Sequence, residues 1–227
     1  MLDDTMNLEE LGRHVFDGVT LKEAPSSTWW DTTSVSLLNQ TNKCCTDKNT
    51  IHSYFNSYDK LFSPIKDRAK NILEIGIHAG GSIKLWHDYF VNANIYAVDI
   101  TECLTGNWLN NYERIKTYKA NAYSPDFLMH EFIQKNIKFD VIIEDGPHSL
   151  ETQQFVASVY SNILSDQGII VIEDVMVENV QPIVDSFPKH LQSNVEVIDL
   201  RGVKNRRDDI LIVCDKSKRR FEGKMKE

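Results

Sequence analysis

Hydrophobic residues follow two patterns along most of the chain. Short continuous apolar runs, such as residues 141–143 and 169–172, are typical of strands that are buried on both faces of a sheet. The segments between them repeat apolar residues every three or four positions, which is typical of amphipathic helices. This alternation predicts a mostly parallel sheet that is covered by helices on both faces.

The predicted strands and helices alternate from residue 51 onward. We expect strands at residues 71–77, 94–100, 114–122, 139–146, 168–175, 195–201 and 209–216. We expect helices at residues 51–62, 82–90, 124–135, 150–164 (ending near Gly168) and 180–190. Because no helix is predicted between the last two strands, one of them is expected to run antiparallel. The sequence therefore predicts a Rossmann-like, doubly wound α/β fold with seven strands, mostly parallel, and an antiparallel last strand.

Two of the predicted helices carry boundary signals. Asp47 or Asn49 is placed to cap the helix at 51–62, and Pro64 is expected to end it. Ser124 followed by Pro125 predicts the capped start of the helix at 124–135.

Composition and charge narrow the possible partners. The chain has 227 residues, which is enough for one sizeable α/β domain, and its net charge of −8 argues against a broad nucleic-acid surface. There is no apolar run of about 20 residues, so no membrane span is expected. The acidic N-terminus does not resemble a signal peptide, and the four cysteines are scattered without a CxxC pair. These features predict a reduced, cytoplasmic protein.

Three regions are expected. Residues 1–45 form a polar N-terminal extension, residues 46–216 form the main domain with its N-terminal helix, and residues 217–227 form a charged tail. Trp29 and Trp30 stand out in the extension, either as a lid over a ligand or as packing residues against the core or a second subunit. The extension is the reason to expect a homodimer.

A glycine-rich turn follows the first predicted strand. Glu74, Gly76, Gly80 and Ser82 form the pattern E-x-G-x-x-x-G-x-S, and Asp99 ends the next strand. Glycines let the backbone approach a ligand closely, and in doubly wound sheets ligands bind beyond the carboxyl ends of the strands. An acid at the end of the second strand is placed to accept hydrogen bonds from ribose hydroxyls. The turn alone is also consistent with a simple connection between a strand and a helix.

Acidic residues follow two further strands. Asp145 ends the strand at 139–146, and Glu173 and Asp174 end the strand at 168–175, which we expect to be its neighbour. Three carboxylates at one edge of a sheet repel one another unless a hard divalent cation such as Mg²⁺ binds them. His148 lies three residues after Asp145 and is a candidate general base. Glu144 is expected to point to the opposite face by strand alternation.

These motifs resemble those of class I S-adenosylmethionine-dependent methyltransferases over about residues 70–216. The resemblance implies that Asp99 binds the cofactor's ribose, and it implies further cofactor contacts from Glu74, Gly76, Gly80, Ser82, Asn121, Ala122 and Asp145. Within that fold, Gly76, Gly80 and Ser82 would lie on the methionine side, and Asn121 and Ala122 near the adenine.

The acids make the resemblance more specific. D-G-x-H followed by I-E-D, together with Thr46–Lys48 and residues 206–213, resembles the metal-dependent sugar O-methyltransferases of the macrocin and mycinamicin type. That resemblance implies Mg²⁺ on Asp145, Glu173 and Asp174, His148 as the catalytic base, and a sugar-containing small molecule or glycan as acceptor. The chain departs from the family at Pro147, where the family usually has serine. A catechol-like phenol as acceptor, or a hydroxylase of the cephalosporin-hydroxylase-like group, stays an alternative.

Other residues keep two interpretations. His52, Tyr54 and Tyr58, expected on one helix, could pack or reach the active site, and His78 could touch the cofactor or face solvent. Arginines near the last two strands could bind a phosphate or pair with nearby acids such as Asp208 and Asp209: Arg201, Arg206 and Arg207.

Overall fold

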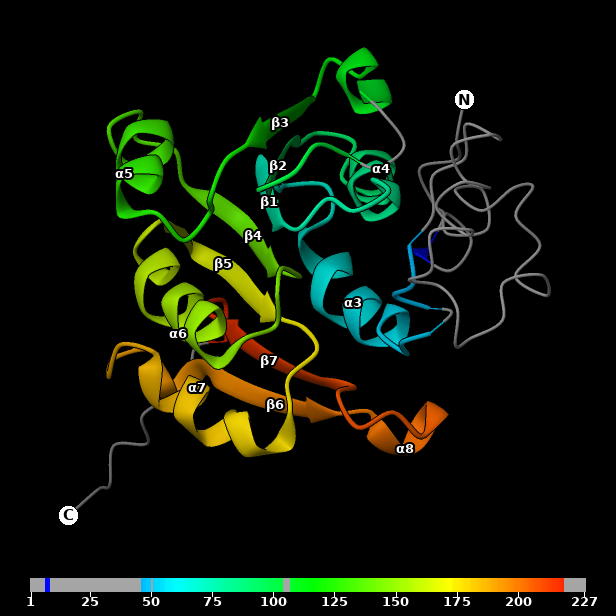
Figure 1. Ribbon diagram of the computed structural model, residues 1–227, viewed down its shortest axis with the longest axis vertical. Coiled ribbons are helices and arrows are strands. Elements are labelled where there is room, and N and C mark those ends of the chain that lie inside the picture. Colours follow the sequence, from blue (N-terminus) through cyan, green and yellow to red (C-terminus); the bar gives the residue numbers. More distant parts are fainter. Residues whose placement is uncertain (1–6, 9–45, 50, 104–106, 219–227) are drawn as a thin grey trace.

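The computed structural model of the chain describes residues 7–8, 46–49, 51–103 and 107–218. These residues form one twisted sheet with helices packed on both faces (Figure 1). The sheet has seven strands in the order β3-β2-β1-β4-β5-β7-β6. The predicted extension with Trp29 and Trp30, and the thiols Cys44 and Cys45, lie outside the described residues.

The strands agree closely with the apolar runs of the sequence. They are β1 (Asn71–Ile75), β2 (Asn94–Asp99), β3 (Ile115–Lys119), β4 (Phe139–Glu144), β5 (Leu164–Ile172), β6 (Val195–Asp199) and β7 (Ile210–Asp215). The helices are α3 (Phe55–Phe62), α4 (Gly81–Tyr89), α5 (Pro125–Leu128), α6 (Leu150–Val159), α7 (Val180–Ser186) and α8 (Arg201–Lys204).

The directions of the strands confirm the predicted topology. β3, β2, β1, β4 and β5 pair in parallel, whereas β7 pairs antiparallel with both β5 and β6. The connection between β6 and β7 contains the four-residue helix α8, which the sequence pattern did not predict. This is the predicted doubly wound sheet with an antiparallel last strand.

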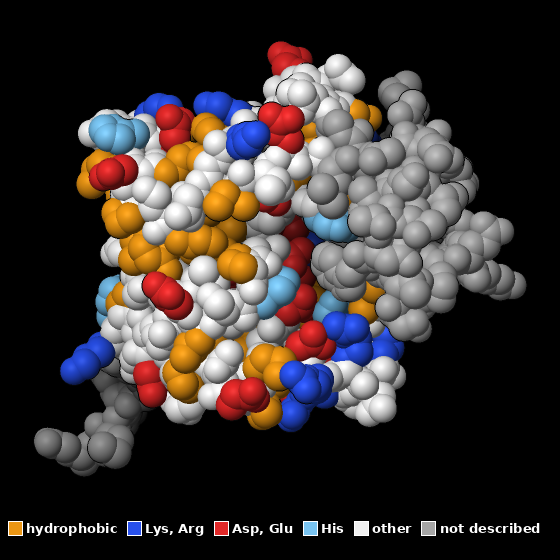
Figure 2. Space-filling view, in the orientation of Figure 1, with side chains coloured by type: hydrophobic (Ala, Val, Ile, Leu, Met, Phe, Trp, Pro, Cys, Tyr) orange, Lys and Arg blue, Asp and Glu red, His pale blue; other side chains and the backbone are white. Residues whose placement is uncertain are grey.

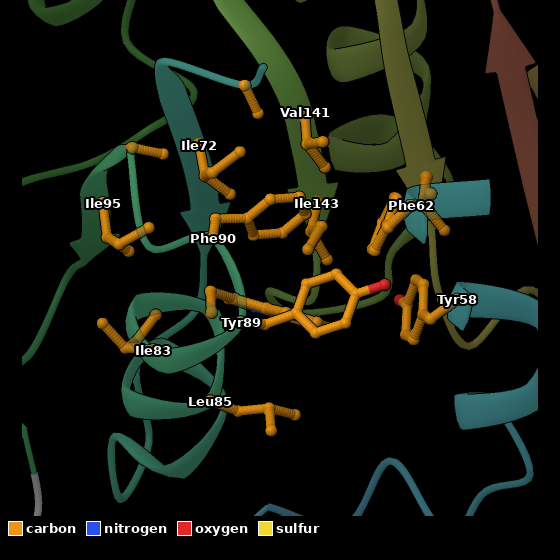
Figure 3. Packing of buried hydrophobic residues seen from close by; sticks show 14 of the residues in the cluster. Tyr58, Phe62, Ile72, Ile83, Leu85, Tyr89, Phe90, Ile95, Val141 and Ile143 are labelled. Carbon is orange, nitrogen blue, oxygen red and sulfur yellow. The ribbon is translucent and has the colours of Figure 1, made fainter. Parts of the chain in front are cut away.

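Alternation along the strands divides the core into two layers. Ile72, Val141 and Val171 face α3 and α4, whereas Leu73 and Ile142 face the layer of α5, α6 and α7. On the first face, aromatic rings of α3 and α4 pack closely over the sheet, as Figure 3 shows for Tyr58, Phe62, Tyr89 and Phe90. Burial of these large rings fixes α3 against the sheet, so that the segment before it is held over the carboxyl ends of β1, β4 and β5.

Two elements begin four residues away from their predicted start, and the helix predicted at 180–190 and the strand predicted at 195–201 end early, at Ser186 and Asp199. The first long helix begins at Phe55, not at Ile51, and its N-cap Tyr54 makes no side-chain cap, so neither Asp47 nor Asn49 caps it. Instead, the Asp47 carbonyl accepts hydrogen bonds from the amides of Ile51 and His52, both at 3.0 Å. Residues 46–49 and 51–54 therefore bring side chains to the sheet edge without forming a helix, which is why His52 and Tyr54 lie outside the helix that was predicted to carry them.

The second wrong boundary lies between α6 and β5. The predicted helix at 150–164 ends at Val159, followed by a 3-10 turn over Tyr160–Asn162. β5 then begins at Leu164, which pairs with Phe139 of β4, four residues before the predicted start. Pairing and burial of Leu164 outweigh the helical pattern there.

The predicted cap of α5 is confirmed, because the Ser124 side chain accepts a hydrogen bond from the Phe127 amide.

Candidate functional site

A cavity of about 450 Å³ opens at the carboxyl ends of β1, β2 and β4. One end is formed by the loops after β1, β2 and β3, and the other by the loops after β4 and β5, with Thr46 and Asp47 from the turn before α3. Figure 2 shows acidic and histidine side chains gathered in a hollow of the molecular surface. The sequence predicted this sheet edge as the ligand site.

The glycine turn is pressed against the end of β4. Gly76 has a φ of 103°, and a Cβ there would lie 2.0 Å from the Asp145 carbonyl oxygen. The Asp145 amide also donates to the Ile75 carbonyl at 2.9 Å. Only glycine fits this contact, because the φ is unfavourable for other residues and the space is filled by backbone. Gly76 therefore lets the turn after β1 pack directly against Asp145, the first of the predicted metal ligands.

Asp99 organises the next loop. Its Oδ2 accepts from the Ile77 amide at 2.9 Å, and its Oδ1 accepts from the amide and hydroxyl of Thr101 at 2.9 and 3.0 Å. The carboxylate still lines the cavity, beside the exposed side chain of Ile100. Asn121 and Ala122 line the same end, and the Ala122 carbonyl is fixed by the Tyr160 hydroxyl at 2.6 Å.

Asp145, His148 and Asp174 meet at the other end of the cavity. His148 Nε2 lies 3.8 Å from Asp145 Oδ1 and 3.5 Å from Asp174 Oδ2. His148 and Asp174 have φ angles of 55° and 54°, which are uncommon for residues with a side chain. Such backbone conformations often mark functional sites, because surrounding contacts must hold them. Here they turn both side chains toward one point in the cavity.

Behind this group lies Lys48, which the sequence interpretation did not name as a site residue. Its side chain is almost fully buried, and its Nζ donates to Asp145 Oδ2 at 2.6 Å and to both Glu173 oxygens at 2.7 and 2.8 Å. Glu74 Oε1 lies 3.1 Å from the same nitrogen. Strand alternation explains the arrangement, since Glu74, Asp145 and Glu173 all project to the face that α3 and α4 cover.

Aromatic residues from α3 and the turn before it complete this inner layer. The Tyr58 hydroxyl donates to Glu173 Oε1, and the Tyr54 hydroxyl donates to Asp174 Oδ1 at 2.5 Å. His52 Nδ1 lies 2.5 Å from Asp209 Oδ1 and 3.3 Å from Asp174 Oδ1. Of the two interpretations left open for His52, Tyr54 and Tyr58, the geometry places all three behind the acids of the site.

Burial changes the proton affinity of these groups. Burial and the nearby charge of Asp145 raise the pKa of Asp174 well above its usual value. Burial also raises the pKa of Glu74 to about 7, although Lys48 opposes the shift. Burial alone would lower the pKa of Lys48, but Asp145, Glu173 and Glu74 raise it well above its usual value. Lys48 is therefore a permanent positive charge among carboxylates.

Glu144 points to the opposite face from Asp145, as strand alternation predicted. It is fully buried and accepts from the Tyr123 hydroxyl at 2.9 and 3.1 Å. Burial raises its pKa to about 8. Tyr123 lines the cavity, so Glu144 fixes a wall of the cavity from behind.

The predicted site residues divide into two groups. The cavity is lined by Gly76, Ser82, Asp99, Asn121, Ala122, Asp145, His148 and Asp174. Three others lie behind or beside it in the described part of the chain. Glu74 accepts from Trp86 Nε1 at 2.6 Å, Gly80 is the left-handed N-cap of α4, and Glu173 is held by Lys48 and Tyr58.

Residues with open interpretations take definite places. His78 lines the cavity, and burial lowers its pKa. Arg201 pairs with Asp199, at 2.7 Å between Nη2 and Oδ2, and Arg206 pairs with Asp208 at 2.9 Å. The expected local pairing is thus observed for Arg201 and Arg206. Within the described ranges, no helix combines the length and apolar character that crossing a membrane requires.

The residues present suit a hard divalent cation. Asp145, His148 and Asp174 can each offer an atom within 4.8 Å of the others, and the same holds for Glu74, Asp145 and Glu173. Asp145 belongs to both groups, one on each side of its carboxylate. Oxygen ligands of this kind favour Mg²⁺, Ca²⁺ or Mn²⁺. Burial, and after it the nearby charge of Asp145, raises the pKa of Asp174, and a bound cation would favour the charged form of that carboxyl.

Comparison with known proteins identifies the fold. The MycE methyltransferase of the mycinamycin pathway, solved with Mg, SAH and mycinamycin VI, superposes with a TM-score of 0.59 at 17% identity, over 80% of this chain and 52% of MycE. A putative rRNA methylase from Clostridium thermocellum superposes with a TM-score of 0.57 at 15% identity, over 72% of this chain and 95% of that chain. The chain has the class I methyltransferase fold.

Curated relatives agree with the resemblance that the motifs indicated. The chain is 30% identical over 138 residues to the 8-demethyl-8-alpha-L-rhamnosyl tetracenomycin-C 2'-O-methyltransferase of Streptomyces olivaceus, covering 56% of this chain and 34% of that protein. It is 26% identical to the mycinamicin VI 2''-O-methyltransferase of Micromonospora griseorubida, over 55% and 32%. The matches therefore span about a third of the relatives' own length. No family model matches the chain.

Proposed function

We propose that the chain is an S-adenosylmethionine-dependent, divalent-metal-dependent O-methyltransferase that acts on a sugar hydroxyl. The observation that carries this proposal is a single cavity that joins the glycine turn and Asp99 at one end to Asp145, His148 and Asp174 at the other. A methyl donor and a metal-bound acceptor would need to meet in such a space.

The first end of the cavity fits the cofactor. Gly76, Asp99, Asn121 and Ala122 line this end of the cavity. We propose that Asp99 would bind the ribose and that Asn121 and Ala122 would lie beside the adenine. The volume of about 450 Å³ is in the range of small-molecule sites. S-adenosylmethionine supplies the methyl group. We propose Glu74 and Gly80 as supports of this end, since Glu74 anchors α4 through Trp86 and Gly80 begins that helix.

The second end would hold the metal and the acceptor. We propose Asp145, Glu173 and Asp174 as the metal ligands. A bound Mg²⁺ would lower the pKa of a sugar hydroxyl and orient it. The Tyr54 hydroxyl holds Asp174 from behind, and the Tyr58 hydroxyl holds Glu173, so hydroxyl donors already orient both carboxylates before a ligand arrives.

His148 is the proposed general base. Its Nε2 faces the cavity between Asp145 and Asp174, and its Nδ1 is buried without a hydrogen-bond partner among the described residues. As general base, the ring would accept the proton of the acceptor hydroxyl on Nε2. Pro147, the departure from the family pattern, precedes this histidine and lines the same cavity.

The sugar acceptor is inferred from the relatives. The names of several describe O-methylation of sugars on tetracenomycin or macrolide scaffolds, such as the L-olivosyl-oleandolide 3-O-methyltransferase of Streptomyces antibioticus. The acids of the cavity would bind a metal for either acceptor, so the preference for a sugar over a catechol-like phenol rests on these names. A cytoplasmic location and a homodimer stay predictions of the sequence.

The direct test is methyl transfer from labelled S-adenosylmethionine to a panel of glycosylated natural products, nucleotide-sugars and free sugars. Each reaction is run as prepared, after EDTA, and after Mg²⁺ is added back. Transfer to a sugar that EDTA abolishes and Mg²⁺ restores supports the proposal. Full activity after chelation would refute the metal requirement, and transfer only to catechols would refute the sugar acceptor.

A further inference from the structure

The Lys48 side chain occupies the position of a cation in the acidic site. Its Nζ contacts four carboxylate oxygens of three acids at 2.6–3.1 Å, and only about 1% of its side chain is exposed. The three acids, Glu74, Asp145 and Glu173, also form one of the groups of described residues whose atoms could hold a metal ion. An ammonium group with three donors is thus bound much as a metal would be.

We propose that Lys48 is the built-in cation of the metal-free site, and that Lys48 and a divalent metal ion exclude each other from the carboxylates of Asp145 and Glu173. This inference rests on the proposed function, because it assumes that Asp145 and Glu173 take part in metal binding. Beyond that function, Lys48 would be a residue that exchanges places with the metal.

Contact with the same atoms is the first argument for exchange. Both oxygens of Glu173 accept from Lys48, and Oε1 also accepts from the Tyr58 hydroxyl. A metal ion that is bound through Glu173 must therefore take an oxygen that Lys48 holds. The ammonium and a divalent ion would also repel each other strongly at this short range, because the site is buried.

The position of Lys48 in the chain is the second argument. Lys48 lies in a turn, not in a strand or helix. Among the described residues, its amide donates to Thr46 Oγ1 at 3.4 Å, and its carbonyl accepts from the Tyr54 amide at 2.8 Å. Its side chain can therefore withdraw without breaking the sheet. Thr46 and Asp47 of the same turn line the cavity, so the movement would also reshape the ligand site.

The test is metal affinity, measured by calorimetry with Mn²⁺ on the full chain. Lys48→Met keeps the length of the side chain and removes the charge, so we expect it to bind Mn²⁺ about tenfold more tightly or better, because competition and repulsion are removed. Lys84→Met is the matched control, because Lys84 also pairs with an acid, Asp88, but on α4. Its affinity should equal that of the wild type. Equal or weaker Mn²⁺ binding by Lys48→Met would overturn the exchange.

Stability gives a second readout that does not depend on turnover. Without metal, Lys48→Met leaves buried carboxylates without their partner, and its melting temperature should fall by about 6–20 °C. Saturating Mn²⁺ should remove most of that difference. A melting temperature equal to that of the wild type without metal would contradict the role of Lys48 as the internal cation.

If Lys48→Met does not fold, the wild type decides the question. In protein labelled with ¹⁵N-lysine, the protected ammonium signal of Lys48 should shift or disappear as Mg²⁺ is added, and the other lysine signals should stay. An unchanged signal at saturating Mg²⁺ would overturn the exchange. Failure of the proposed function has a different result, namely methyl transfer that persists after EDTA.

Discussion

Gly76 is the residue at which the glycine turn touches the end of β4 and the proposed metal site, so its replacement tests the geometry of both. In Gly76→Ala the new Cβ would lie 2.0 Å from the Asp145 carbonyl oxygen and 2.8 Å from its carbonyl carbon. Both atoms belong to the backbone at the end of β4, which is held between β1 and β5 and cannot turn aside as a flexible side chain could.

Two costs add in this variant. A φ of 103° is unfavourable for a residue with a Cβ, at about 1–3 kcal/mol. Forcing extra volume into a packed position costs about 1–3 kcal/mol more. The sum of about 2–6 kcal/mol corresponds to a fall in melting temperature of roughly 4–24 °C for a domain of this size. Because the Asp145 backbone must move, metal binding should weaken as well.

Gly202→Ala is the matched control, since a Cβ there meets nothing within 4 Å and the residue lies in α8. The assay is thermal unfolding of both variants and the wild type, followed by Mn²⁺ and S-adenosylhomocysteine calorimetry. The free energy of unfolding of Gly202→Ala should lie within about 1 kcal/mol of the wild-type value or slightly exceed that value. If Gly76→Ala is as stable as Gly202→Ala and binds both ligands normally, the close contact between the turn and β4 does not exist in solution.

Four further predictions concern single side chains of the site. His148→Ala should lower the methyl-transfer rate by about 10²–10⁴ and leave Mn²⁺ affinity nearly unchanged, as rate and calorimetry measurements can show. Asp174→Ala should abolish metal-dependent turnover while S-adenosylhomocysteine binding persists; retained turnover would contradict its role as a ligand. Asp99→Ala should weaken S-adenosylhomocysteine binding by about 1.5–3 kcal/mol, and unchanged calorimetric affinity would refute its role. Burial raises the pKa of Glu144 to about 8 in the folded chain, against an ordinary value of 4.5. Between these two pH values the folded state holds a proton that the unfolded state releases, so the free energy of unfolding should fall as the pH rises from about 4.5 to about 8. Denaturant titrations should show that Glu144→Gln flattens this pH dependence.

The sheet could be predicted because its strands correspond to local patterns of apolar residues in the sequence. Continuous apolar runs marked the central strands, and the short connection between β6 and β7 indicated the antiparallel last strand. The failures occur where tertiary contacts outweigh local patterns. Leu164 fits the end of a helix by spacing, but it pairs with Phe139 and begins β5. Residues 51–54 also fit a helix, but they form a turn that reaches Asp174 and Asp209.

The site could be predicted in outline for a similar reason. Carboxyl ends of parallel strands share one edge, so acids after β4 and β5 had to meet, and alternation sent Glu144 to the other face. What no local pattern could reveal was the layer behind them. Lys48 lies 97 residues from Asp145 and 125 residues from Glu173 in sequence, and only the packing of α3 on the sheet brings them together. The resemblance of Thr46–Lys48 to a family segment was the one available signal.

The two layers have a common physical cause. The acids on this buried edge, which we propose to hold a divalent ion, create a negative charge that the fold must tolerate whenever no ion is bound. Here the fold meets this need with donors from a single segment: Lys48 and Tyr58 on Glu173, and Tyr54 on Asp174. Because that segment also contributes Thr46 and Asp47 to the cavity wall, the balance of charge in the inner layer and the shape of the ligand site are physically linked.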